Sequence, residues 1–311
     1  MNLLSFQPHG REISDTIVSY DPDTLERHSV LKSEVLREFV AVGNRRAISI
    51  VERIPERDDV LDPAVVDDLL VRTHCEMQRI SEEFQHGMRV AELLKPLLRA
   101  LRDKDIEKPM RIVDIGCGTG YVLRWLANTR ALGEDVELIG ADLNVALIRE
   151  AQRLAAAEKL DCKFIIANAF RLDHAAHIYI STGILHHFRD AALSELLEQH
   201  DRPDTCAFVH FDFHPSRFAP FGSWLFHAVR MREPLAKHDG VLSAVRAHNS
   251  RLLLEAARSA APDFVSAIYG TRLWGLPIPR VFHSLVGVRA KYRDRFLQNM
   301  GGRIASLGCI E

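Results

Sequence analysis

The sequence predicts an α/β fold in which a mostly parallel, doubly wound sheet follows a helical N-terminal cap. Three observations support this prediction. Apolar strand-like segments alternate with helical patterns between residues 110 and 215. A glycine-rich turn follows the first of these segments. A long amphipathic stripe precedes it. Strands that alternate with helices form βαβ units, and such units build parallel sheets with helices on both faces.

The predicted cap covers residues 1–105 and is mainly helical. We expect a helix within Thr24–Val42 and a short strand at Ala47–Val51. Asp62-Pro63 is typical of an N-cap followed by proline at the first helical position. The amphipathic stripe begins there, because apolar residues then recur at steps of mostly three or four: Val66, Leu70, Met77, Ile80, Phe84, Met88, Ala91 and Leu94. Gly87 is expected to divide it into two helices.

The strands and helices of the sheet follow in order. The predicted strands are Arg111–Ile115, Glu137–Asp142, Cys162–Ala167, His177–Thr182, Cys206–Phe213, Phe264–Thr271 and Phe282–Ala290. Helices are expected at Gly120–Arg130, Val145–Lys159, Arg189–His200 and Val241–Ala260. Between Pro215 and Gly240 the pattern changes to aromatic and basic residues, and we expect this segment to form a lid over the site.

The segment Val113-Asp114-Ile115-Gly116-Cys117-Gly118-Thr119-Gly120 is a strand followed by a glycine turn and a helix start. Glycines lack a Cβ, so a ligand can lie on the backbone and the turn can use positive φ. The free N–H groups of the following helix face the same place. Asp114 can accept hydrogen bonds from a cationic or hydroxylated ligand. The next strand also ends in an acid, Asp142, whose carboxylate can bind both hydroxyls of a ribose.

This D-x-G-x-G-x-G pattern is one residue tighter than the G-x-G-x-x-G of dinucleotide-binding folds. It resembles motif I of the class I S-adenosylmethionine (SAM) dependent methyltransferases. The resemblance covers residues 110–290 and implies a seven-stranded sheet with an antiparallel last strand, SAM as cofactor, and a methyltransferase domain over residues 106–311. The alternative is a short glycine turn in an unrelated α/β protein.

The resemblance also implies which residues bind SAM. Asp142 is expected to hold the ribose, the junction after the third strand the adenine, and the junction after the fourth strand the methionine part. The alternative for Asn168 is an ordinary turn residue. Cys117 is expected to be a compact filler of the loop. The full expected set is Asp114, Gly116, Cys117, Gly118, Gly120, Tyr121, Asp142, Leu143, Asn168, Ala169, Phe170, Thr182 and Gly183.

Three histidines are candidates for catalysis. Ser181–Phe188 resembles the small-small-x-x-Leu-His-His motif of small-molecule methyltransferases, in which a histidine faces the pocket. His186 or His187 is therefore a candidate general base, and the alternative is that both hold the loop through hydrogen bonds. His210, Asp212 and His214 share one face of a strand, which makes His214 a third candidate. The acidic pattern of the family's metal-dependent members is not evident, so we expect no metal.

Composition restricts the remaining possibilities. The chain has 311 residues, 47% of them hydrophobic, and a formal net charge of −2, which favours neither nucleic acid nor an anionic membrane as a partner. Its 5 cysteines are widely spaced, so we expect no disulfide framework and a reducing cytoplasm. Neither a secretory signal nor a membrane span is expected. The sequence leaves the oligomeric state open.

We therefore expect a SAM-dependent methyltransferase that acts on a small molecule, with oxygen favoured over nitrogen or carbon as the acceptor. Two alternatives stay open. One is methylation of RNA or protein, although the near-neutral charge and the lack of an N/D-P-P-[YF] motif disfavour it. The other is a SAM-binding scaffold without catalysis, in which the N-terminal part provides a partner surface.

Overall fold

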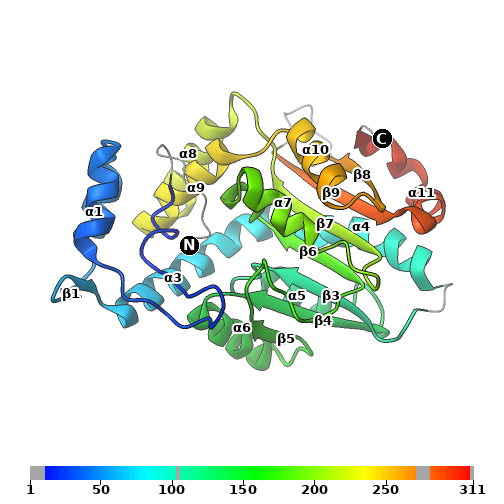
Figure 1. Ribbon diagram of the computed structural model, residues 1–311, viewed down its shortest axis with the longest axis horizontal. Coiled ribbons are helices and arrows are strands. Elements are labelled where there is room, and N and C mark those ends of the chain that lie inside the picture. Colours follow the sequence, from blue (N-terminus) through cyan, green and yellow to red (C-terminus); the bar gives the residue numbers. More distant parts are fainter. Residues whose placement is uncertain (1–10, 103–105, 271–280, 309–311) are drawn as a thin grey trace.

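A mixed β-sheet of eight strands forms the centre of the computed structural model, which describes residues 11–102, 106–270 and 281–308 (Figure 1). The strands are β3 (Met110–Ile115), β4 (Val136–Asp142), β5 (Lys163–Ile166), β6 (Ile178–Thr182), β7 (Ala207–Phe213), β8 (Phe264–Tyr269), β9 (Phe282–Arg289) and β10 (Leu307–Gly308). All seven predicted strands are present. Thr271, the predicted end of one of them, lies outside the described residues.

The sheet has the order β10-β8-β9-β7-β6-β3-β4-β5. Strands β3 to β7 are parallel to their neighbours within this group, whereas β9 is antiparallel to both β7 and β8. The antiparallel seventh strand is thus confirmed. The predicted count of seven is wrong by one, because the two-residue strand β10 adds an antiparallel edge beside β8. So short a strand carries no periodicity that the sequence could reveal.

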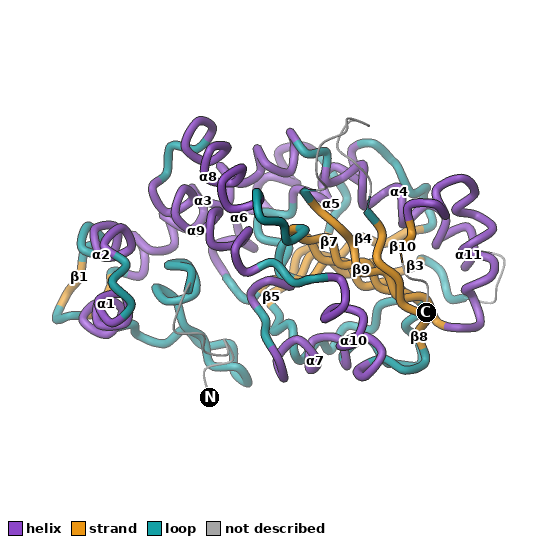
Figure 2. The backbone as a smooth tube through the Cα atoms, turned by 90° about the horizontal axis from the view of Figure 1, so that it is seen from above, coloured by secondary structure: helices purple, strands orange, loops and turns teal. Residues whose placement is uncertain are grey.

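Two apolar layers hold helices against the two faces of the sheet (Figure 2). Alternate side chains of β3 divide between them: Ile112 lies in one cluster and Val113 in the other, as period-two alternation requires. The first cluster contains α4 (His86–Arg102), α5 (Tyr121–Asn128), α6 (Val145–Glu158) and α11 (Arg293–Met300). The second contains α7 (Asp190–Glu198) and α10 (Ser250–Ala260). The doubly wound α/β fold is therefore confirmed.

The N-terminal elements lie away from the sheet and have a core of their own (Figure 1). They are α1 (Lys32–Ala41), α2 (Arg45–Val51), the short strands β1 (Glu56–Arg57) and β2 (Val60–Leu61), and the start of α3 (Pro63–Glu83). The predicted strand at Ala47–Val51 is wrong, because this segment is helical. The Asn44 side chain caps the helix by accepting from the backbone N–H of Ala47 (3.0 Å).

The junction between α3 and α4 lies two residues before the predicted break at Gly87, which is inside α4. The chain turns at Phe84 and Gln85, where Gln85 has a φ of 57°, and α4 then begins at His86. Helix α4 lies within the range predicted for the cap, yet its apolar face packs into the core of the sheet. The division of the chain at residue 105 remains a prediction.

Two further helices occupy most of the segment predicted as a lid. They are α8 (Ala219–Arg230) and α9 (Pro234–Arg246), and α9 contributes Leu235 to the N-terminal core. The single helix expected over Val241–Ala260 is wrong, because Asn249 caps a new helix, α10, through the backbone N–H of Leu252 (2.9 Å). No helix among the described residues has the length and apolarity to cross a membrane.

The N-cap of α3 supplies a test of the N-terminal region. The Asp62 carboxylate accepts from the backbone N–H groups of Ala64 (2.9 Å) and Val65 (3.3 Å). Asp62→Ala should lower the free energy of unfolding by about 0.5–2 kcal/mol, since two helix-terminal donors lose their acceptor. Chemical denaturation measures this change, and Asp62→Asn, which keeps an acceptor oxygen, is the control. An unchanged midpoint in Asp62→Ala would contradict the capping role.

Candidate active site

A cavity of about 390 Å³ lies at the carboxyl ends of the parallel strands. Strands β3, β4, β6 and β7 all end there, and β3 is flanked by β4 on one side and β6 on the other. Ligands of open α/β sheets bind at this reversal of strand order. Helix α3, α9 and the N-terminal segment around Asp15 complete the wall.

The glycine loop forms one side of the cavity. Gly116, Gly118 and Gly120 have φ values of 66°, 54° and 72°, which favour glycine. Asp142 braces the loop, because its carboxylate accepts from the backbone N–H of Gly118 and of Asn144, each at 2.9 Å. A Cβ on Gly120 would lie 2.4 Å from the Phe164 ring, so this glycine serves helix packing rather than the cavity.

Asp114 lies beneath the loop in an apolar setting. Asp114 is buried and is part of the cavity wall, and its Oδ1 atom has no hydrogen-bond partner. Burial, reinforced by the nearby Asp142 carboxylate, raises the pKa of Asp114 to about 8. An unpartnered carboxyl group of this kind is suited to receive a cationic or hydrogen-bonding group of a ligand.

The cavity brings together most of the residues that the sequence associates with the cofactor. Those in its wall are Asp114, Gly116, Cys117, Gly118, Tyr121, Asp142, Leu143, Thr182 and Gly183. Gly120, Asn168, Ala169 and Phe170 are not part of the wall. The Asn168 side chain instead donates to the carbonyl of Pro22 (2.9 Å) and accepts from the backbone N–H of Phe170 (3.0 Å), as a turn residue does.

His186 and His187 form the opposite side of the cavity, in the 3₁₀ turn η1 (Leu185–His187) after β6. His186 Nδ1 lies 2.8 Å from Asp212 Oδ1 at the end of β7, and His187 Nδ1 lies 2.9 Å from Asp15 Oδ1. Both rings are thereby oriented through Nδ1. The buried Nε2 atom of His186 has no hydrogen-bond partner.

The two histidines differ in charge state. Burial lowers the pKa of His186, and the Asp212 carboxylate only partly offsets this effect. Burial acts in the same direction on His187, but the Asp15 and Glu12 carboxylates outweigh it and raise its pKa to about 9. The pKa of Asp212 is held below its usual range, because His186 and backbone N–H groups outweigh its burial.

Glu12 lies between the two imidazoles. Its carboxylate oxygens are 3.6 Å from His186 Nε2 and 3.7 Å from His187 Nε2. Burial raises the pKa of Glu12 to about 8. Ser243 donates to it (3.1 Å), and Arg246 binds the neighbouring Asp15 (2.7 Å). The side chains on this side of the cavity are therefore mostly acidic groups and imidazoles.

Two expectations about the periphery are not met. His214 is absent from the cavity wall, and its Nδ1 lies 3.3 Å from His283 Nδ1 instead. Of the predicted lid, Pro215–Gly240, only Asp239 lines the cavity, so the aromatic and basic side chains of that segment do not reach this space. Three of them, Phe221, Trp224 and Arg230, are exposed on α8.

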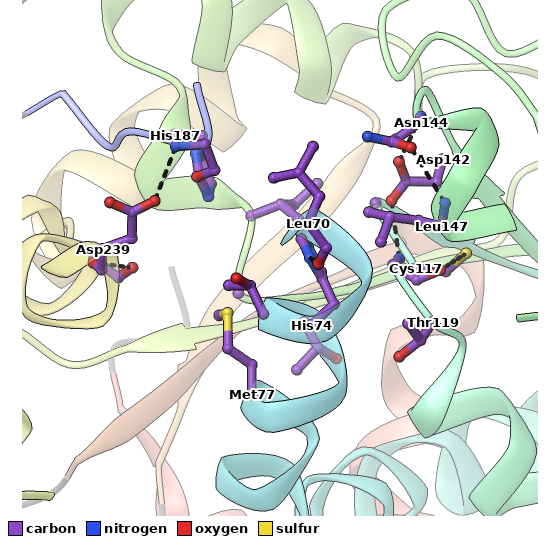
Figure 3. Close-up of a pocket in the computed structure, with 18 of the residues that line it drawn as sticks. Leu70, His74, Met77, Cys117, Thr119, Asp142, Asn144, Leu147, His187 and Asp239 are labelled. Atoms are coloured by element: carbon purple, nitrogen blue, oxygen red, sulfur yellow. Dashed lines mark hydrogen bonds between the residues drawn. The ribbon is translucent and has the colours of Figure 1, made fainter. Parts of the chain in front are cut away.

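Several lining residues escaped the sequence analysis. They come from α3, α9 and the N-terminal segment: Glu12, Asp15, His74, Met77, Asp239 and Ser243. Figure 3 shows Leu70, His74 and Met77 of α3 between the glycine loop on one side and His187 and Asp239 on the other. Long-range packing alone brings these residues to the cavity. The only local sign of them in the sequence is the pair of acids Glu12 and Asp15, which are three residues apart.

Comparison with known proteins agrees with this geometry. Residues 112–202 match a family model described as a methyltransferase domain. The plantazolicin methyltransferase BpumL, solved with S-adenosylhomocysteine (SAH), has a TM-score of 0.52 at 18% identity over 83% of this chain and 99% of that one. Magnesium protoporphyrin IX methyltransferase from Synechocystis has a TM-score of 0.46 at 15% identity over 83% and 100%. No curated protein matches by sequence.

The likeness to BpumL shows the fold, and the matched domain shows the class of enzyme. Together they define a methyltransferase domain on the class I, Rossmann-like fold. The chain therefore contains a methyltransferase domain, at residues 112–202.

Proposed function

We propose that this enzyme transfers the methyl group of SAM to a hydroxyl oxygen of a small molecule. The observation that carries the proposal is the shared cavity, which has the glycine loop on one side and the cluster of Glu12, His186 and His187 on the other. A volume of about 390 Å³ is typical of sites for small molecules. Side chains that can take up a proton lie opposite the expected cofactor position. They suit a hydroxyl substrate, which must lose its proton when it accepts the methyl group.

The cofactor would lie on the glycine loop. The Asp142 carboxylate accepts two hydrogen bonds from backbone N–H groups and has further lone pairs. With these it would accept hydrogen bonds from the ribose hydroxyls. Asp114 would receive the ammonium group, which would supply the partner that its Oδ1 lacks. Thr182 and Gly183 would lie under the methionine part. SAM would then point its sulfonium toward the histidines across the cavity.

His186 is the side chain best placed to take the acceptor proton. Its Nδ1 is held by Asp212 at 2.8 Å, and its Nε2 is free of hydrogen bonds beside the cavity. In the reaction the hydroxyl proton passes to Nε2 and the oxygen attacks the methyl carbon. The carbon–sulfur bond breaks with its electron pair left on sulfur, which yields SAH and the methyl ether. Alignment of the reactants can supply about 7–11 kcal/mol of the rate enhancement.

Asp142 gives a test of the cofactor site. Asp142→Ala should weaken SAH binding by about 1–3 kcal/mol, roughly 5–150-fold, since charge-assisted hydrogen bonds to the ribose are lost. Isothermal titration calorimetry measures the affinity. Asp173→Ala, which changes an exposed acid on the surface, is the matched control and should bind SAH normally. Equal affinity of Asp142→Ala and wild type would place the ribose elsewhere.

A further inference from the structure

The cluster of Glu12, His186 and His187 has the donor set of a metal centre. One ligand atom from each residue lies within 4.8 Å of the other two. We propose that Nε2 of His186, Nε2 of His187 and the Glu12 carboxylate bind a divalent transition-metal ion at the acceptor end of the cavity. Metal binding itself does not depend on the proposed function, whereas the catalytic role given to the ion below rests on it.

The orientation of both imidazoles supports this site. Each ring uses Nδ1 to contact a carboxylate, His186 at Asp212 (2.8 Å) and His187 at Asp15 (2.9 Å). Metal-binding histidines usually have such outer carboxylates, which fix the tautomer and turn the other nitrogen toward the ion. Here both remaining Nε2 atoms are turned toward the same carboxylate, that of Glu12.

The spacing of the ligand atoms also fits. His186 Nε2 lies 3.6 Å and His187 Nε2 lies 3.7 Å from the nearer Glu12 oxygens, which is too long for hydrogen bonds. Ligands about 2.0–2.1 Å from a tetrahedral zinc ion lie roughly 3.3 Å apart. The two distances to Glu12 are close to that value, and side-chain rotation would have to bring the whole set, now within 4.8 Å, to it. The His186 side chain is only 3% exposed, and its Nε2 atom has no hydrogen-bond partner.

The charges around the cluster favour a dication. Glu12 and Asp212 are buried carboxylates, Asp15 is partly buried, and the Arg246 guanidinium contacts Asp15 (2.7 Å) and approaches Glu12 (3.5 Å). Metal ligation requires an ionised Glu12 and two neutral imidazoles, and in that form the three carboxylates and Arg246 leave two negative charges. The next acid, Asp239, is already bound by two backbone N–H groups and by a histidine. Burial makes such uncompensated charge costly, and a divalent ion would neutralise it.

The donor chemistry indicates the class of metal. Two imidazoles and one carboxylate suit zinc, iron, cobalt or nickel, whereas magnesium and calcium prefer oxygen ligands throughout. A three-residue set leaves coordination positions open toward the cavity. An acceptor hydroxyl bound there would have a lowered pKa, would release its proton to solvent, and would present its oxygen to the methyl group. His186 would then hold the ion rather than take the proton itself.

Metal binding can be measured without any knowledge of the acceptor. The full-length protein, stripped with a chelator, would be titrated with Zn²⁺ by calorimetry and with Co²⁺ by visible absorption. We expect one ion per chain. His186→Ala and Glu12→Gln should each weaken binding by more than about tenfold, the lower bound found when even outer partners of a metal site are lost. Unchanged SAH affinity in both variants would show that they are folded.

The matched control is His74→Ala, which removes another histidine of the cavity wall outside the cluster and should leave metal affinity unchanged. The proposal would be overturned if the wild-type protein bound no stoichiometric metal ion. It would also be overturned if Glu12→Gln and His186→Ala both bound the metal ion as tightly as the wild type. If stripped enzyme methylates a hydroxyl at full rate, the catalytic role of the ion is wrong while the proposed O-methylation stands. If the ion binds and only nitrogen acceptors react, the metal site stands and the proposed function fails.

Discussion

Replacement of His186 by alanine should lower turnover on a hydroxylated acceptor by about 10²–10⁴-fold. The loss follows from the position of its buried Nε2, which has no hydrogen-bond partner and lies beside the cavity across from the glycine loop. The affinity for SAM should stay near that of the wild type, because the side chain acts on the acceptor. Screening hydroxylated metabolites for SAH release would first identify an acceptor, and steady-state kinetics would then measure the change.

His174→Ala is the control for this experiment, because His174 is exposed and lies outside the cavity wall. It should turn over like the wild type. Full activity of His186→Ala on a confirmed acceptor would mean that alignment of the reactants alone drives the reaction. A parallel fall in thermal stability and SAM affinity would instead indicate that the histidine only holds the loop.

Replacement of Gly118 by valine should abolish cofactor binding. This glycine has a φ of 54° and a backbone N–H bound to Asp142, and a Cβ there would lie 3.0 Å from the His74 ring. A branched side chain would therefore project into the cavity where the cofactor must lie, and it would also strain the turn. Isothermal titration with SAH should show no detectable heat of binding.

A second variant separates strain from obstruction. Gly43 has a φ of 67°, a Cβ added to it would have no neighbour within 4 Å, and it lies outside the cavity wall. Gly43→Val therefore adds similar backbone strain but should bind SAH normally. If Gly118→Val keeps its affinity, the cofactor does not lie on this loop. If both variants lose binding and melt early, strain rather than obstruction explains the loss.

The sheet was predictable because its signals are local. Strand β3 is buried on both faces, its residues Ile112, Val113 and Ile115 are apolar, and the glycine turn marks its end. The N-terminal helices were harder to predict. Ala47, Ile50 and Val51 are buried at helical spacing. In the sequence, however, five mostly apolar residues do not distinguish a helix from a strand. The cap formed by the Asn44 side chain favours the helix.

The cofactor side of the site was predictable for the same reason, since Asp114 and Gly118 belong to one glycine motif and Asp142 ends the next strand. The acceptor side was not. His187 and Asp15 are separated by 172 positions in sequence, and only the folded chain brings them to 2.9 Å. We expected no metal because the acidic pattern of the family's metal-dependent members is not evident in the sequence. The cluster that has suitable geometry takes Glu12 from a segment without a recognisable motif.

A crystal structure with bound SAH would show whether one cavity holds the cofactor on the glycine loop and the acceptor at the histidines. We expect the ribose hydroxyls on Asp142 and the sulfur directed toward the cluster of Glu12, His186 and His187. SAH bound with its sulfur turned away from this cluster, or bound outside the cavity, would mean that the two sites are not shared in this way.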